Sequence, residues 1–326
     1  MRICVVGAGI VGLTAAFELA RRGVAVDLYE RQAGPGLGCS YFAGGMIAPW
    51  CERETTEQIV TDLGLEALDF WTTTFPVGTR AGSLVVAPPR DRPEVMRFSK
   101  RTSHFEACDQ RRLGELEPDL ADRFPFGLHF PEEAYIEPRA AMAELARALA
   151  GFAHVRLHFS TEAPDESGFD ITLDCRGFSA RDALPDLRGV KGEMLVLSAG
   201  DLAITRSVRM VHPRRPVYIV PRPGGSYMIG ATMIENEEPG RVTARGMMEL
   251  LGSAYTLHPA FGESEILETG CDVRPAFADN LPRIRVRGKR IFINGLFRHG
   301  FLLSPALATR VADIVTKGAS FPEFDR

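Results

Sequence analysis

The stretch Arg2–Glu30, RICVVGAGIVGLTAAFELARRGVAVDLYE, decides the fold of the N-terminal part of the chain. Residues 2–6 are an apolar run of the kind found in strands that are buried on both faces. After a glycine-rich turn, apolar residues recur at helical spacing until Gly23, and residues 24–30 form a second apolar run. This order of strand, tight turn, helix and strand predicts a βαβ unit.

The turn between the first strand and the helix reads Gly7-Ala-Gly9-Ile-Val-Gly12, and Glu30 ends the second strand. In a dinucleotide-binding fingerprint the first glycine permits the turn, the second lets a pyrophosphate approach the backbone, and the third lets helix and strand pack closely. The phosphate charge then meets the helix N-terminus, and the acidic residue accepts hydrogen bonds from a ribose. The alternative is a glycine-rich turn without a ligand, but the strand, the helix and the acid are all in place here.

Bulk properties exclude several classes of protein. With 326 residues the chain has room for about two domains. A net charge of −4 and a pI near 6.0 disfavour nucleic acids and anionic membranes as partners. No apolar run approaches the ~20 residues of a membrane span, so stable membrane insertion is not expected. Six cysteines lie apart without a Cys-x-x-Cys pair, which predicts reduced thiols, no metal site and, with no recognisable export signal, a cytoplasmic protein.

The regular alternation of strands and helices stops after the βαβ unit and returns only in two later parts of the chain. We therefore expect an α/β, Rossmann-like domain assembled from discontinuous segments, and a second, α+β domain with a mainly antiparallel sheet that binds the substrate. The first domain is predicted from residues 1–78, 134–188 and 271–326, and the second from residues 79–133 and 189–270.

The interrupted pattern favours FAD over a nicotinamide dinucleotide, because a nicotinamide enzyme normally completes its doubly wound sheet before the chain leaves the domain. The last helix, predicted to begin at Pro305, fits this interpretation. Its N-terminus and the backbone N–H groups before it would stabilise negative charge on the pyrimidine end of a reduced flavin.

In the middle of the chain, residues 92–120 are predicted as one mostly polar helix.

Several motifs resemble those of the D-amino-acid oxidase superfamily, and within it the ThiO-type glycine oxidases of thiamin biosynthesis. The resemblance runs nearly from end to end. Besides the Gly7–Glu30 segment, it is carried by Ser40-Tyr-Phe-Ala-Gly-Gly-Met46, Asp174-Cys-Arg-Gly177, Val217-Tyr-Ile-Val-Pro-Arg222, Gly230-Ala-Thr-Met233, Val273-Arg-Pro275 and Phe297-Arg-His-Gly-Phe-Leu-Leu-Ser-Pro305.

This resemblance implies an enzyme that holds FAD non-covalently and oxidises the Cα–N bond of a small amino acid, with hydride transfer to flavin N5. In the ThiO-type branch the expected substrate is glycine, the product is iminoacetate or glyoxylate with H2O2, and the imine supplies thiazole synthesis. Dioxygen or another acceptor reoxidises the flavin, and a homo-oligomer is a possible assembly.

The resemblance also assigns the substrate pocket. Arg274 matches the arginine that binds the substrate carboxylate, and Tyr218 the tyrosine that assists it. Arg298 matches a second pocket arginine, and Met46 and Met233 match methionines of the pocket wall. A planar guanidinium suits a carboxylate, and hydride transfer depends on geometry more than on a side-chain base, so no general base is proposed. The alternatives are a surface ion pair for the arginines, a core tyrosine and core-filling methionines.

The residues expected around FAD come from both ends of the chain and from the strand near residue 175. They are Gly7, Gly9, Ile10, Val11, Gly12, Glu30, Arg31, Ser40, Gly45, Met46, Cys175, Gly177, Arg274, Arg298, His299, Gly300, Phe301, Leu302 and Leu303.

Two other functions stay open at this stage. One is an oxidase or dehydrogenase of sarcosine, of another N-substituted amino acid or of a D-amino acid. The other is a dinucleotide-binding protein without catalytic activity.

Overall fold

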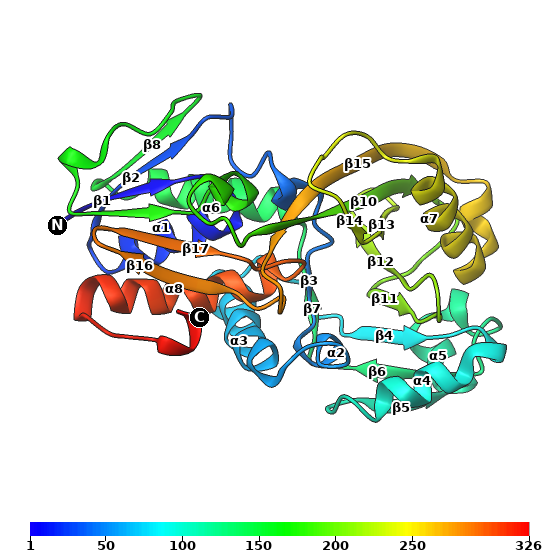
Figure 1. Ribbon diagram of the computed structural model, residues 1–326. Coiled ribbons are helices and arrows are strands. Elements are labelled where there is room, and N and C mark those ends of the chain that lie inside the picture. Colours follow the sequence, from blue (N-terminus) through cyan, green and yellow to red (C-terminus); the bar gives the residue numbers. More distant parts are fainter. Residues whose placement is uncertain (326) are drawn as a thin grey trace.

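The computed structural model describes residues 1–325, whose strands form one sheet of six strands, one of nine and a separate two-stranded pair (Figure 1). The six-stranded sheet has the order β16-β17-β9-β1-β2-β8 and is parallel except for the β16–β17 hairpin. Its strands are β1 (Arg2–Val6), β2 (Ala25–Glu30), β8 (Val155–Phe159), β9 (Ile171–Asp174), β16 (Arg283–Arg287) and β17 (Arg290–Asn294). The N-terminal and C-terminal parts of the chain thus share one sheet, as the Rossmann-like α/β prediction requires.

The nine-stranded sheet is largely antiparallel, which confirms the predicted fold class of the second part of the molecule. Only β4 and β11 pair in parallel. Its strands are β4 (Ser83–Val86), β5 (Glu106–Asp109), β6 (Phe126–Phe130), β10 (Arg188–Ser198), β11 (Ser207–Met210), β12 (Val217–Arg222), β13 (Ser226–Gly230), β14 (Ile234–Glu235) and β15 (Glu265–Ala276). Because β10 and β15 run across the predicted limits near residues 188 and 270, the exact segment boundaries stay a prediction.

Helices cover the two sheets in different ways. Beside the six-stranded sheet, α1 (Ile10–Arg21) packs against α6 (Pro138–Ala150) and α8 (Gly300–Lys317), and α8 packs against α3 (Gln58–Asp69). On the nine-stranded sheet, α5 (Gln110–Leu116) and α7 (Ala244–Leu257) share one hydrophobic core with the strands. The remaining α-helices and strands are α2 (Pro49–Glu52), α4 (Arg92–Ser99), β3 (Met46–Ile47) and β7 (Ala134–Tyr135), and β3 pairs with β7. Among residues 1–325 no helix is both long and apolar enough to cross a membrane.

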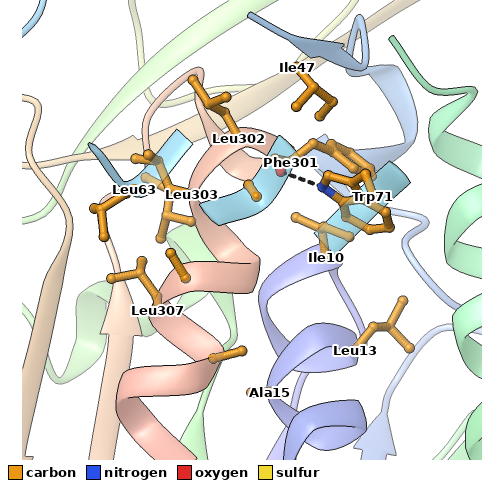
Figure 2. Packing of buried hydrophobic residues seen from close by; sticks show 14 of the residues in the cluster. Ile10, Leu13, Ala15, Ile47, Leu63, Trp71, Phe301, Leu302, Leu303 and Leu307 are labelled. Carbon is orange, nitrogen blue, oxygen red and sulfur yellow. Dashed lines mark hydrogen bonds between the residues drawn. The ribbon is translucent and has the colours of Figure 1, made fainter. Parts of the chain in front are cut away.

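The last helix begins five residues earlier than predicted, at Gly300, so that Pro305 lies inside α8. A proline has no N–H group to offer to the carbonyl four residues before it. Here that carbonyl belongs to Phe301, and it accepts a 2.9 Å hydrogen bond from Nε1 of the buried Trp71 (Figure 2). The indole therefore replaces the missing helical donor, and the prediction that α8 starts at Pro305 was wrong.

Residues 92–120 are also not the single polar helix that was predicted. The helix α4 ends at Ser99, and the edge strand β5 follows, in which Cys108 is buried between exposed neighbours. Asp109 then begins α5 by accepting a hydrogen bond from the backbone N–H of Arg112 at 2.8 Å. The pairing of β5 with β6 supplies hydrogen bonds that the polar composition of the segment does not reveal.

Candidate active site

Two adjoining cavities lie between the sheets. The larger has a volume of about 500 Å³ and follows the carboxyl ends of β1, β2 and β9 and the start of α1. The smaller, of about 170 Å³, lies between the start of α8 and strands of the nine-stranded sheet. The residues that line both cavities, and so lie where the two adjoin, are Ile10, Cys39, Ser40, Asp272, Phe297 and Gly300.

The three glycines of the fingerprint differ in whether the protein itself leaves room for a side chain. Gly7 has a φ of +101°, and a Cβ there would lie 2.7 Å from the Cys175 carbonyl oxygen. A Cβ on Gly12 would overlap the Gly7 carbonyl oxygen. By contrast, Gly9 has an ordinary extended backbone, and its Cβ would meet only Ser40 Oγ, at 3.5 Å. The protein itself therefore has room for a side chain at Gly9, which lines the larger cavity.

The polar groups at this end of the larger cavity are held in place by the backbone. Glu30 accepts hydrogen bonds from the N–H groups of Ala8 at 2.8 Å and Gln32 at 2.9 Å. Ser40 Oγ accepts one from the N–H of Ile10, at the first turn of α1, at 3.2 Å. A carboxylate at the end of β2 and a helix N-terminus without a carboxylate cap thus face the same cavity, as binding of a ribose and a pyrophosphate requires.

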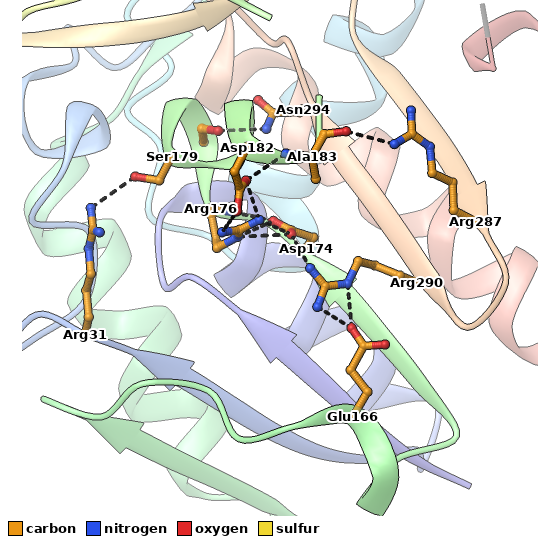
Figure 3. Close-up of polar contacts among 11 residues, drawn as sticks. Arg31, Glu166, Asp174, Arg176, Ser179, Asp182, Ala183, Arg287, Arg290 and Asn294 are labelled. Atoms are coloured by element: carbon orange, nitrogen blue, oxygen red, sulfur yellow. Dashed lines mark hydrogen bonds and ion pairs between the residues drawn. The ribbon is translucent and has the colours of Figure 1, made fainter. Parts of the chain in front are cut away.

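Another part of the wall is the turn after β9, which a polar network fixes (Figure 3). Arg176 binds the carboxylates of both Asp174 and Asp182, and Asn294 of β17 donates to the Gly177 carbonyl oxygen at 2.8 Å. Gly177 has a φ of +59°, in the left-handed region that favours glycine. Three residues that were predicted to contact FAD, Cys175, Gly177 and Arg31, line this cavity, and the Arg31 guanidinium donates a hydrogen bond to Ser179 at 3.0 Å.

The smaller cavity meets the first turn of α8. Gly300, Phe301 and Leu302 line it, and among the described residues their backbone N–H groups have no hydrogen-bond partner. The first N–H of the helix that is paired within it is that of Leu303, which donates to the His299 carbonyl at 2.9 Å. Three N–H donors and the positive end of an 18-residue helix therefore face one side of this cavity.

The other side of the smaller cavity is one face of the nine-stranded sheet. Side chains alternate along each strand, and Val208, Ile219 and Ile229 point into the core beneath α5 and α7. Their neighbours in the register therefore point the other way, toward the cavity: Arg209 on β11, Tyr218 on β12 and Gly230 on β13.

The same register extends through β10 to β15. Gly192 of β10 lies opposite Asp272 of β15, and Arg274 follows two residues later on the same face. The sheet thus gathers residues that are 65 positions apart in the sequence, from Arg209 to Arg274, on one wall of the cavity. The Val273-Arg-Pro275 and Val217–Arg222 motifs each contribute residues to this cavity.

Arg274 has an unusual environment for a guanidinium inside a protein. Among the described residues it has no carboxylate within ion-pair distance, and its one hydrogen bond goes to the Thr232 carbonyl oxygen at 3.1 Å. Its guanidinium occupies the space over Gly192, where a side chain would overlap it. Burial lowers the pKa of Arg274, and the nearby Arg298 lowers it further, whereas Tyr218 acts in the opposite direction. The group still carries its charge at neutral pH and lacks an anionic partner.

Tyr218 lies beside it in a slot that only glycines permit. A Cβ on Gly44 would lie 2.6 Å from the Tyr218 ring, and a Cβ on Gly230 would lie 2.7 Å from it. The hydroxyl group has no hydrogen-bond partner among residues 1–325. Burial raises the pKa of the phenol, so the hydroxyl remains a hydrogen-bond donor at neutral pH.

Glu52, at the end of α2, joins the two walls and was not predicted. It is buried, and its carboxylate binds Arg209 on one side and Arg298 on the other, the latter at 2.7 Å. The His299 Nε2 atom lies 2.9 Å from the same oxygen. Burial alone would raise the pKa of Glu52, but the charges of Arg209 and Arg298 hold it well below its usual value.

Arg209 and Asp272 are further cavity residues that the sequence analysis missed. The one available signal for Glu52 was its position as the first charged residue after the apolar segment 41–51. Nothing local distinguishes Arg209 in Ser207–Met210, because its partner is 157 residues away. Both are identified only through the fold.

The other predicted site residues divide into two groups. Gly45, Met46 and Met233 line the smaller cavity, with Met233 more than half exposed at its mouth, while Val11 lines the larger one. Gly12 and Leu303 line neither. Gly12 packs beneath the turn at Gly7, and Leu303 is fully buried among residues such as Leu63 and Leu307 (Figure 2). Their contribution is to the packing of α1 and α8.

Known proteins resemble this chain along nearly its whole length. Residues 2–314 match the family model described as DAO, FAD dependent oxidoreductase. The chain is 50% identical over 313 residues to a Rhizobium etli protein named as a thiamine biosynthesis oxidoreductase, ThiO, covering 96% of this chain and 95% of that one. It is 26% identical to the glycine oxidase of Geobacillus kaustophilus over 97% of this chain and 93% of the relative.

The fold is shared as well. The crystal structure of glycine oxidase from Geobacillus kaustophilus superposes with a TM-score of 0.84 at 23% identity, and the match covers 98% of this chain and 96% of that one. The chain belongs to the DAO family of FAD-dependent oxidoreductases. It is accordingly an FAD-dependent enzyme, and the resemblance found in the motifs is confirmed.

Proposed function

We propose that the protein oxidises glycine to its imine at a non-covalently bound FAD, and that the imine supplies thiazole synthesis in thiamin biosynthesis. The observation that carries the proposal is Arg274, a cavity guanidinium without an anionic partner among the described residues. The relatives support the same reaction, since they include a thiamine biosynthesis oxidoreductase ThiO at 50% identity and a glycine oxidase.

The residues present fit FAD. Gly9 leaves space in the larger cavity that no protein group fills, Glu30 offers a carboxylate there, and the first turn of α8 offers unpaired N–H donors at the smaller cavity. The larger cavity would hold the adenosine and the pyrophosphate, and the smaller one the flavin ring and the substrate. When bound, FAD supplies the acceptor for the hydride from the substrate Cα. Non-covalent binding is favoured because no cysteine follows Cys271 in the sequence.

The side chains would bind and orient an amino acid rather than exchange protons with it. Arg274 would bind the carboxylate through two parallel hydrogen bonds, and the Tyr218 hydroxyl would donate a third. Glu52 does not serve as a base, because its pKa is held low and both of its oxygens are bound to cationic or imidazole groups. Catalysis would then rest on orientation of the Cα–H bond toward the cofactor.

The segments 1–78, 134–188 and 271–326 are proposed as the FAD-binding domain, and 79–133 with 189–270 as the substrate-binding domain. We further propose that dioxygen is the electron acceptor, that H2O2 is formed, and that the enzyme works in the cytoplasm.

Anaerobic mixing tests the reaction. Glycine should bleach the yellow, FAD-loaded protein, and Arg274→Ala should keep its flavin but lose bleaching at the same glycine concentration. A matched control is Arg241→Ala, since Arg241 is exposed and outside both cavities. If only sarcosine or larger D-amino acids bleach the flavin, the substrate is that amine and not glycine. Absence of bleaching by any amine, with FAD fully bound, would contradict an oxidase.

A further inference from the structure

One carboxylate where the two cavities adjoin, that of Asp272, has almost no partners within the protein. FAD consists of adenosine, pyrophosphate, a ribityl chain and the flavin ring, in that order. If the two ends occupy the larger and the smaller cavity, the ribityl chain must run through the passage between them. Its hydroxyl groups are then removed from water and need hydrogen-bond partners from the protein.

Polar side chains around this passage belong to Ser40, Cys39 and Asp272. The Ser40 oxygen is already bound to the N–H of Ile10. Burial raises the pKa of the Cys39 thiol to about 12, which leaves it a neutral and weak hydrogen-bonding group. Asp272 therefore supplies the strong acceptor at this point of the cavity.

The carboxylate of Asp272 is poorly satisfied in the protein alone. Its Oδ1 accepts a 2.7 Å hydrogen bond from the N–H of the next residue, Val273. Among residues 1–325 it makes no other hydrogen bond and no ion pair. Its Oδ2 faces Gly38, where even an added Cβ would be 3.8 Å away. Burial raises the pKa of this carboxyl group, as expected for a carboxylate that lacks partners.

The strand that carries Asp272 also explains its direction. Asp272 and Arg274 are two residues apart on β15 and point to the same face, and Asp272 lies opposite Gly192, which has no side chain. Arg274 lines only the smaller cavity, whereas Asp272 lines both. One strand would thus present a donor to the substrate and an acceptor to the neighbouring part of the cofactor.

We propose that Asp272 binds the ribityl chain of FAD by accepting hydrogen bonds from its hydroxyl groups. The inference rests on FAD binding in the two cavities as proposed above. A carboxylate is well suited to this ligand, because hydrogen bonds to a charged acceptor are stronger than those between neutral groups. Asp272 is then a cofactor-binding residue that acts on the retention of FAD and not on the reacting atoms.

The test is a binding cycle on the apoprotein reconstituted with FAD, measured by flavin fluorescence. Asp272→Ala should raise the Kd of FAD by about 10- to 100-fold, the range expected for hydrogen bonds to a charged group. An FAD analogue with a ribityl chain that lacks hydroxyl groups should bind the wild-type protein more weakly by a similar factor. It should bind Asp272→Ala no more weakly than FAD does, because the partner is already absent. The control Asp201→Ala changes an exposed acid outside both cavities and should leave the Kd unchanged.

An unchanged Kd in Asp272→Ala, or equal losses for the analogue in the wild type and the variant, would overturn the proposal. If the alanine variant unfolds at lower temperature than the wild type, Asp272→Leu keeps about the size of the side chain without an acceptor, and the same cycle applies to it. Failure of the wild-type protein to bind FAD at all would instead contradict the proposed function. If FAD binds tightly but the analogue is weakened equally in the wild type and the variant, only the role proposed for Asp272 is contradicted.

Discussion

A substitution at Gly9, the second glycine of the fingerprint, should affect binding of the cofactor without affecting the stability of the fold. At Gly9 the backbone has φ −69° and ψ 178°, which any residue adopts, and an added Cβ meets only Ser40 Oγ at 3.5 Å. Gly9→Ala should therefore leave the apoprotein as stable as the wild type, or more stable by about 0.4–1 kcal/mol, because alanine reduces the entropy of the unfolded chain. Gly12→Ala should destabilise the apoprotein strongly, because its Cβ overlaps the Gly7 carbonyl oxygen.

The effect on FAD should be the reverse of the effect on the apoprotein. The added methyl group of Gly9→Ala enters the larger cavity at the start of α1, where a pyrophosphate would approach the backbone. Displacement that breaks one or two charge-assisted hydrogen bonds costs about 1.5–3 kcal/mol each, which corresponds to a Kd increase of at least about tenfold. The measurements are thermal unfolding of the apoprotein and the flavin-to-protein absorbance ratio after gel filtration. Full flavin retention in Gly9→Ala, or a loss of stability as large as that of Gly12→Ala, would refute the reasoning.

Three other predictions concern the substrate, the pH dependence and α8. Arg274→Ala should raise the KM for glycine by about 10²- to 10³-fold with flavin content intact, because a bidentate charge-assisted pair is lost; an unchanged KM in steady-state assays would remove Arg274 from the site. Burial raises the pKa of Glu133 to about 7, so the folded protein holds this proton more tightly than the unfolded chain does. The free energy of unfolding should therefore fall by about 3 kcal/mol as the pH rises from 4 to 7 and the carboxyl group loses its proton. Glu133→Gln should consequently be more stable than the wild type at pH 8 and not at pH 4.5, as measured by urea unfolding at both pH values. Trp71→Phe should cost about 1–3 kcal/mol more than Trp50→Phe, because only the former leaves the Phe301 carbonyl unpaired in the buried turn before Pro305; equal losses in the two variants would show that the indole hydrogen bond contributes nothing.

The parts of the fold that could be predicted are those set by residues close together in the sequence. The βαβ unit depends on residues within one short segment, and the glycines, the helix and Glu30 are placed as expected. The start of α8 was misplaced because the carbonyl that Pro305 leaves without a helical donor, that of Phe301, accepts a hydrogen bond from Trp71, which lies 230 residues away in the sequence. Residues 92–120 were misassigned for a related reason, since the pairing of β5 with β6 outweighs the polar composition of the segment. In each case a contact distant in the sequence decided the local structure.

A contact distant in the sequence also sets Arg274, the proposed substrate ligand, apart from the other arginines of the cavity. Three arginines, Arg209, Arg274 and Arg298, line the smaller cavity, and a local pattern does not distinguish their roles. The fold brings Glu52 between Arg209 and Arg298, so that two of the guanidinium groups share one carboxylate.

Arg298 is restricted further, because it also donates to Thr55 Oγ1 at 2.6 Å. A carboxylate that enters the cavity would have to compete with Glu52 for either of these two groups, at the cost of leaving a buried charge unpaired. At Arg274 it meets a cation that has no carboxylate partner among the described residues and a phenol hydroxyl that has no acceptor. We therefore expect the substrate carboxylate to bind at Arg274, the one of these three arginines that Glu52 does not contact.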